Sequence, residues 1–337
     1  MRDGTRAFPQ RHTRMKSHLI ITALLLASLV ELHASTPVGT KGTVGAPANS
    51  KTVNRLEITE PGEYENLVVD GNGARGNLVK ITADNVTVRN IEIRNGSGNA
   101  IGIFGDNVVI ENCRIRYMLN GTFEKQDDAH GISGRWSNTI IRNCDISYCS
   151  GDCIQFDPDR KSSGTAIIED CTLWTGPLPA DTALFRAGQR PGENAVDTKT
   201  KLDGPRCILK IRNCHMHGFN QPAQIDNVAA LNIKENVDAD VIHCVFNNNE
   251  ISFRLRGPGK RGGARVTVTD CAIYDSKFGV RAEDNIEVLK ISGLGFGQGV
   301  GERTKFVNGK ANAGYKNTGE YEAGGMETLL KYGFLQR

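Results

Sequence analysis

Short segments in which apolar and polar residues alternate recur along most of the chain. Seven of them share one pattern, in which two mainly apolar residues precede two polar residues, then Cys or Ile, any residue and an apolar residue. The copies are VTVRNIEI (86–93), VVIENCRI (108–115), TIIRNCDI (139–146), AIIEDCTL (166–173), LKIRNCHM (209–216), DVIHCVF (240–246) and VTVTDCAI (266–273). Alternation with a period of two predicts β-strands that bury one face.

The spacing of the copies predicts how these strands assemble. They recur every 22 to 43 residues, and the chain is rich in Asn and contains 38 glycines. Such a period is typical of a solenoid, in which each coil buries its apolar face against its neighbours. We therefore expect an all-β fold, a single-stranded right-handed parallel β-helix of about seven or eight turns over residues 50–300.

Cysteine occupies one slot of this pattern in six of the seven copies. These residues are Cys113, Cys144, Cys171, Cys214, Cys244 and Cys271. Nine cysteines in an exported chain would suggest disulfides, but an odd number in register favours buried thiols that pack as small hydrophobes. We expect this column to point inward. Cys149 and Cys153 lie outside the column, and a disulfide between them is left open.

A second short strand follows each copy, and its apolar residues are expected to point inward at Ile101, Ile132, Ile154, Val196, Leu231 and Phe253. The outward slots on successive rungs hold Gln155 and Asp157, Asp197 and Lys199, Asn232 and Lys234, Arg254 and Arg256, and Arg281 and Glu283. Adjacent parallel strands lie about 4.8 Å apart, so these side chains should form one charged band. Gly- and Pro-rich loops at residues 175–194 and 257–265 flank the band and are suited to form the walls of a groove.

The charged band has two interpretations. Exposed ion pairs would make it a solvated ladder that contributes little to stability. However, four cations on three consecutive rungs outnumber the carboxylates beside them. Because like charges repel, this excess favours a bound polyanion.

The chain termini predict export and a cap. Residues 1–35 form a basic extension and an apolar run from Lys16 to Ser35, which is typical of a bacterial signal peptide for secretion or the periplasm, with a membrane anchor as the alternative. Removing them leaves 36 basic and 36 acidic residues, so we expect no nucleic-acid partner and no membrane span in the mature form. Residues 301–337 are expected to be a polar linker followed by a short helix, METLLKYGFL, that covers the open end of the solenoid.

The stretch LNIKEN…ISFRLRG, with a lysine followed about twenty residues later by Phe-Arg, resembles the chondroitinase B and alginate lyase group of β-helical polysaccharide lyases. The preceding PGENAVDTK is similar to the acidic segment that supplies metal ligands in that group. The resemblance implies a lysine base, an assisting arginine and a calcium ion held by acidic and amide side chains. It covers residues 190–257.

The residue types in the band suit β-elimination from a uronate. Lys234 or Lys199 would remove the proton beside the sugar carboxylate, and Arg254 and Arg256 would hold that carboxylate. We expect Ca²⁺ to be bound by Asp157, Glu193 and Asp197 and the substrate to contact Asn232, Arg281 and Gln155. The predicted partner is an acidic polysaccharide of alginate, pectate or glycosaminoglycan type, bound by a monomer.

Other functions remain open at this point. Asp157 and Asp197 could be the carboxylate pair of a β-helical glycoside hydrolase or epimerase. The chain could also bind glycans without catalysis. His130 is expected to cap or pack in an earlier turn, and His215 and His217 are interpreted as surface residues rather than metal ligands.

Overall fold

The computed structural model describes residues 38–121, 126–157, 164–177, 191–201, 203–221, 225–226, 228–234, 236–257, 262–283, 286–311 and 313–325. All the regular structure in these ranges is β-strand. None of these residues forms a helix long and apolar enough to cross a membrane. The predicted signal segment and the predicted C-terminal helix lie outside the described residues.

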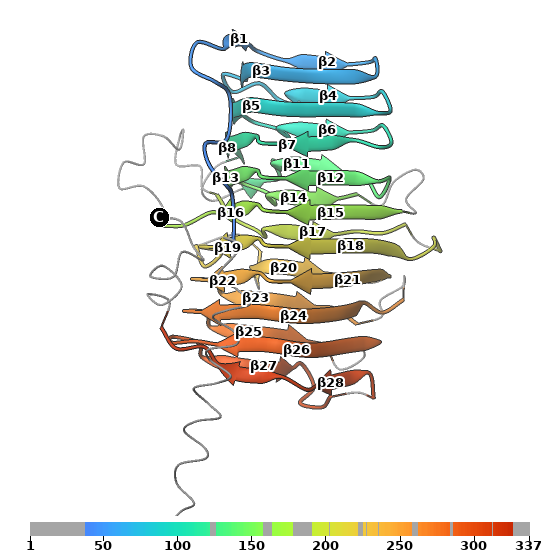
Figure 1. The fold of residues 1–337 in the computed structure, drawn as a ribbon, viewed down its shortest axis with the longest axis vertical. Helices are drawn as coiled ribbons and strands as arrows, with labels where there is room; N and C mark the ends of the chain where they lie inside the picture. Colours follow the sequence, from blue (N-terminus) through green and yellow to red (C-terminus); the bar gives the residue numbers. More distant parts are fainter. Residues whose placement is uncertain are drawn as a thin grey trace, which may run out of the picture.

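The chain winds into a stack of coils whose strands pair in parallel with the coils above and below (Figure 1). A ten-stranded sheet contains β2 (Leu56–Ile58), β4 (Val79–Ile81), β6 (Ile101–Ile103), β11 (Ile132–Gly134), β14 (Ile154–Phe156), β17 (Val196–Thr198), β20 (Ala229–Ile233), β23 (Ile251–Leu255), β25 (Phe278–Ala282) and β27 (Glu302–Phe306). A seventeen-stranded sheet contains β1 (Lys51–Val53), β3 (Gly62–Asp70), β5 (Val86–Gly96), β7 (Val109–Glu111), β8 (Arg114–Met118), β12 (Thr139–Arg142), β13 (Asp145–Cys149), β15 (Thr165–Glu169), β16 (Thr172–Trp174), β18 (Cys207–Arg212), β19 (His215–His217), β21 (Val237–Ile242), β22 (Val245–Asn247), β24 (Arg265–Tyr274), β26 (Val288–Phe296), β28 (Tyr315–Asn317) and β29 (Glu320–Glu322). A short antiparallel pair, β9 (Asn120–Gly121) and β10 (Gln126–Asp127), follows β8 in the chain. The predicted parallel β-helix is confirmed, although its ten-stranded sheet gives more turns than the seven or eight expected.

The polar residue before each column cysteine makes the corner that divides the seventeen-stranded sheet into two limbs. Asn112, Asn143 and Asn213 have φ of 54°, 50° and 52°, a left-handed conformation that Asn tolerates better than most residues. Their amides also bond from rung to rung, with Asn143 Nδ2 donating to Asn112 Oδ1 at 3.0 Å. The repeated Asn-Cys pair therefore encodes a bend followed by an inward side chain.

The cysteine column points inward, as predicted. Its six side chains are buried, and all nine cysteines of the chain are free thiols. Each column Sγ donates to a nearby carbonyl, as Cys113 does to Glu111 O at 3.2 Å. The thiols therefore act as small core residues with weak hydrogen bonds. Cys149 and Cys153 are likewise free and buried.

The ten-stranded sheet has the inward register expected from the sequence. Ile132 pairs with Ile101 and Ile154, and Leu231 pairs with Val196 and Phe253. All six predicted inward side chains are buried. Because strand side chains alternate, this register fixes which residues face outward on the same strands.

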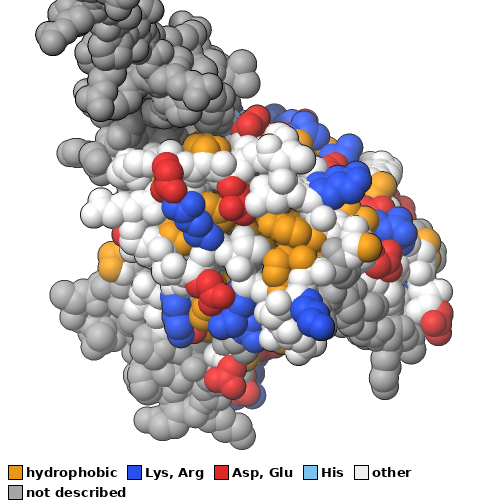
Figure 2. Space-filling view, turned by 90° about the horizontal axis from the view of Figure 1, so that it is seen from below, with side chains coloured by type: hydrophobic (Ala, Val, Ile, Leu, Met, Phe, Trp, Pro, Cys, Tyr) orange, Lys and Arg blue, Asp and Glu red, His pale blue; other side chains and the backbone are white. Residues whose placement is uncertain are grey.

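Both ends of the described chain add to the stack. The segment from Val38 to Gly45 runs across several coils, where Gly39 N donates to Asn213 O at 2.7 Å and Gly45 N to Asn112 O at 3.0 Å. Beyond residue 300, β27 pairs with β25, and β28 and β29 pair with β26, so part of the predicted linker is paired strand. Seen from below, hydrophobic side chains are visible at this end between charged residues (Figure 2).

Candidate functional site

The outward slots of the ten-stranded sheet form two adjacent columns of polar side chains, which we call the charged face. In the first column Gln155 pairs with Asp197, Asp197 with Asn232, Asn232 with Arg254, and Arg254 with Arg281. The second column, two residues further along each strand, holds Asp157, Lys199, Lys234, Arg256 and Glu283. The rung order derived from the sequence is therefore the order in the structure.

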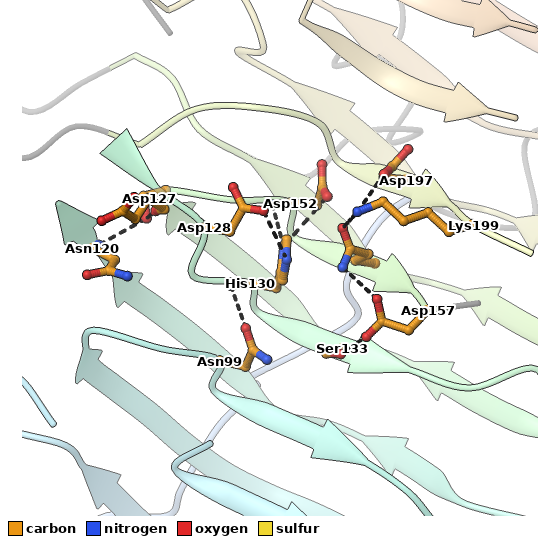
Figure 3. Close-up of polar contacts among 12 residues, drawn as sticks. Asn99, Asn120, Asp127, Asp128, His130, Ser133, Asp152, Asp157, Asp197 and Lys199 are labelled. Carbon is orange, nitrogen blue, oxygen red and sulfur yellow. Dashed lines mark hydrogen bonds and ion pairs between the residues drawn. The ribbon is translucent and has the colours of Figure 1, made fainter. Parts of the chain in front are cut away.

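One chain of hydrogen bonds joins three rungs at the N-terminal side of this face (Figure 3). Lys199 Nζ donates to Gln155 Oε1 at 2.6 Å, and Gln155 Nε2 donates to Asp157 Oδ1 at 2.8 Å. Ser133 Oγ donates to Asp157 Oδ2 at 2.5 Å. Both carboxylate oxygens of Asp157 are therefore occupied, and the contact of Lys199 in this chain is a neutral amide.

Asp197 lies at the buried centre of the charged face. It is 3% exposed, and its Oδ2 is 2.8 Å from Lys234 Nζ and 3.9 Å from Lys199 Nζ. Burial, with a contribution from the charge of Asp152, raises the pKa of Asp197 to about 6 in spite of the two lysines. Asp197 Oδ1 and Asn232 Oδ1, on neighbouring strands, are buried without a hydrogen-bond partner among the described residues. Such acceptors are rare in proteins and are often satisfied by a ligand or water.

The C-terminal side of the face is strongly basic. Arg254 is half-buried, and burial followed by the charges of Arg256 and Arg281 lowers its pKa. Arg256 forms an ion pair with Glu283 at 3.1 Å. Arg254 therefore lies among like charges, an arrangement that suits a bound anion.

A column of turn residues beside the face was only partly anticipated from the sequence. His130 N donates to Asn99 Oδ1 at 3.1 Å, Asp152 N to His130 Nδ1 at 2.9 Å, and Asn194 N to Asp152 Oδ1 at 3.1 Å. Because Nδ1 accepts a hydrogen bond, His130 is neutral in this arrangement, and burial lowers its pKa. The prediction that His130 caps or packs is confirmed.

Asp152 in this column and Glu193 have strongly raised pKa values. Burial raises the pKa of Asp152 to about 6, and its Oδ2 is buried without a hydrogen bond among the described residues. Burial, then the charges of Asp152 and Asp128, raises the pKa of Glu193 to about 9. The sequence analysis did not identify Asp152 or Asp128 as site residues. The only sequence signal was the position of Asp152 just before a strand.

The three predicted calcium ligands have other partners or a raised pKa in this structure. Asp157 already accepts two hydrogen bonds, and Asp197 is paired with Lys234. Glu193, with its pKa raised to about 9, carries a proton at neutral pH. Across the described ranges, no three His, Cys, Asp or Glu side chains are grouped so that they could hold a metal ion. Calcium binding stays a prediction.

His215 and His217 are half-buried rather than surface residues. His215 Nε2 is 2.6 Å from Asn247 Oδ1, and the His217 ring stacks on Trp174 with 5.7 Å between centroids. Burial lowers their pKa values to about 3 and about 4. Both rings therefore have packing roles away from the charged face.

Comparisons with known proteins agree with the architecture. Residues 76–237 match the family model "Right handed beta helix region". This right-handed β-helix match includes the rungs of Gln155, Asp197 and Asn232 and ends before Arg254. Among solved structures, the chain is similar to the crystal structure of pectate lyase Pel9A, with 12% identity, a TM-score of 0.47, and coverage of 91% of this chain and 81% of that chain. At these values the likeness carries no functional information, and a comparison with curated proteins gives no match.

Proposed function

We propose that the chain is a lyase that cleaves a uronate-containing polysaccharide by β-elimination on the charged face. The observation that carries the proposal is the position of Arg254 between Arg256 and Arg281, whose charges both lower its pKa. A substrate carboxylate bound there relieves the repulsion among the three guanidinium groups. Arginine is suited to this role because it stays charged and grips a carboxylate with two parallel hydrogen bonds.

Binding the carboxylate also prepares the chemistry. Removal of the proton at C5 of a uronate places negative charge next to the carboxylate, so neutralising that carboxylate lowers the barrier. The arginines supply this neutralisation from fixed positions on neighbouring strands. The same cations would not assist the hydrolysis of a neutral glycoside.

The two lysines differ in their ability to act as the base. A lysine must lose a proton before it can accept one, and a nearby carboxylate opposes that loss. Lys234 Nζ is 2.8 Å from Asp197 Oδ2, whereas Lys199 Nζ is 3.9 Å from the same atom and bonds to the amide of Gln155. We therefore assign the role of base to Lys199, which has the longer contact with Asp197, whereas the pair of Lys234 with Asp197 fixes the neighbouring rung.

The leaving oxygen needs a proton as the bond from C4 breaks. Among the described carboxyl groups, Glu193 has the highest pKa, about 9, and it lies close enough to Asp197 and Lys199 to feel both charges. It can donate its proton to this oxygen at neutral pH. The proton from C5 then ends on Lys199, the electron pair forms the C4=C5 double bond, and the shortened chain leaves as an alcohol.

A panel of polymers tests the proposal. Purified protein incubated with pectate, alginate and glycosaminoglycans, with calcium or with a chelator, should release ultraviolet-absorbing unsaturated ends from at least one of them. New reducing ends without ultraviolet absorbance would instead support a hydrolase. That alternative uses Asp197 as the acid, since its raised pKa of about 6 suits this role. Binding without any product would support a glycan-binding protein.

A further inference from the structure

The first column of the charged face continues as cations beyond the residues of the proposed reaction. Arg254 on β23 pairs with Arg281 on β25, and Arg281 pairs with Lys305 on β27. Three basic side chains thus occupy three consecutive rungs, each about 4.8 Å from the next. On the other side of Asp197, the next three rungs hold the uncharged residues Gln155, Ser133 and Gly102, and the column continues to Lys80 and Glu57. The run of three consecutive cations therefore lies on the C-terminal side of Asp197.

Two carboxylates near these cations form ion pairs with basic residues of the same face. Among the described residues, Glu283 is bonded to Arg256 in the second column, at 3.1 Å. Lys305 is 3.3 Å from Glu302, a solvent-exposed contact within one strand, and its side chain is 41% exposed. Such an exposed pair is weak and is easily replaced by a stronger anion.

We propose that Arg254, Arg281 and Lys305 bind the carboxylates of successive sugar units, so that the substrate is a polymer with an acidic group on every unit. This inference rests on the proposed lyase function and narrows its substrate class. A rung spacing is comparable with the length of one sugar unit, so a chain lying along the helix axis presents one unit to each rung. A polymer in which acidic and neutral units alternate would leave every second cation without its carboxylate.

Binding measured without turnover tests this inference. In a Lys199→Ala background, calorimetry would compare a pentameric homopolyuronate with a glycosaminoglycan oligomer of equal length and alternating acidic units. Arg281→Gln and Lys305→Gln should each weaken binding of the homopolyuronate about tenfold, as loss of one charged hydrogen bond does. Both should change binding of the alternating oligomer less. Lys290→Gln, which removes an exposed lysine from β26 on the other sheet, is the matched control and should have no effect.

The outcomes separate the inference from the lyase proposal. Tighter binding of the alternating oligomer, or unchanged affinity for the homopolyuronate in both Gln variants, overturns the inference even if unsaturated products form. Charge-dependent binding of the homopolyuronate without unsaturated product from the parent enzyme supports the inference and overturns the lyase proposal. Because Lys199→Ala could perturb the fold, the Michaelis constant of Arg281→Gln in the otherwise unchanged enzyme is the second measurement. It should rise about tenfold on the homopolyuronate, and an unchanged value counts against the inference.

Discussion

Asp197 on β17 and Lys234 just beyond β20 form an ion pair at the buried centre of the charged face, with 2.8 Å between Oδ2 and Nζ. The carboxylate is 3% exposed, so it depends on this lysine more than a surface acid would. The two residues are 37 positions apart in the sequence, and their ion pair links neighbouring rungs. It fixes the acid two rungs from Arg254 in the first column of the charged face.

Replacing Lys234 by Met should destabilise the protein in a pH-dependent way. The variant leaves a buried carboxylate unpaired, which lowers the free energy of unfolding by about 3 kcal/mol where Asp197 is charged. At pH 5 the carboxyl group, whose pKa is already about 6, takes up a proton and the loss should shrink. Urea unfolding at pH 5 and pH 8 measures the difference, with Lys290→Met as the control. Equal losses at the two pH values would contradict the buried ion pair.

The two lysines can be separated by exchange for arginine. Lys199→Arg keeps the charge but removes a group able to lose a proton, so kcat/KM should fall at least about 10²-fold. Lys234→Arg can still pair with Asp197 and should keep most activity. The reverse result, an inactive Lys234→Arg and an active Lys199→Arg, would assign the base to Lys234.

Asp152 should make the folded state less stable as the pH rises. Its folded pKa of about 6 lies above the ordinary value of 3.8, so the folded state binds the extra proton and loses stability as pH increases between these values. Asp152→Asn keeps the acceptor for Asn194 N, as Asn99 and Asn194 do in the same column. Its free energy of unfolding should exceed that of the parent by at most about 3 kcal/mol at pH 7.5 and by less at pH 4.5. A difference that does not vary with pH would show that Asp152 titrates normally.

Thiol counting tests the core. All nine cysteines are buried and free. A thiol reagent should therefore label almost none of them in the native protein and all nine in the denatured, unreduced protein. Seven sites would indicate a disulfide between Cys149 and Cys153. Fewer than seven would mean that column cysteines are cross-linked, which their inward register does not predict.

Much of the fold could be predicted from the sequence because each coil of a solenoid needs the same residue types at the same positions. A polar residue followed by Cys marks a bend and an inward thiol in coil after coil, so the cysteine column could be predicted without a structure. Alternation then fixed the outward columns, and Asp197 and Arg254 fall on the expected rungs. The paired strands after residue 300 were missed since their sequences lack the pattern.

The contacts within the site could not be predicted in the same way. Lys199 and Lys234 occupy equivalent slots, and only the side-chain geometry shows that one bonds to an amide and the other to a carboxylate. The charges of Asp152 and Asp128 raise the pKa of Glu193, although both residues are remote from it in the sequence. The pKa values of such groups depend on burial and on charges from neighbouring coils, which no local pattern records.

The most direct test of the central claim is the rate of unsaturated product formation by Arg254→Ala on the polymer that the parent enzyme cleaves best. Losing a group that stabilises the transition state in this way typically lowers the rate by about 10² to 10³. Arg265→Ala, which removes an exposed arginine from β24, should keep the parental rate, and both variants should unfold at the parental temperature. Loss of product with Arg254→Ala alone is the predicted result. A parental rate in Arg254→Ala would contradict the account and leave the charged face as a solvated ladder.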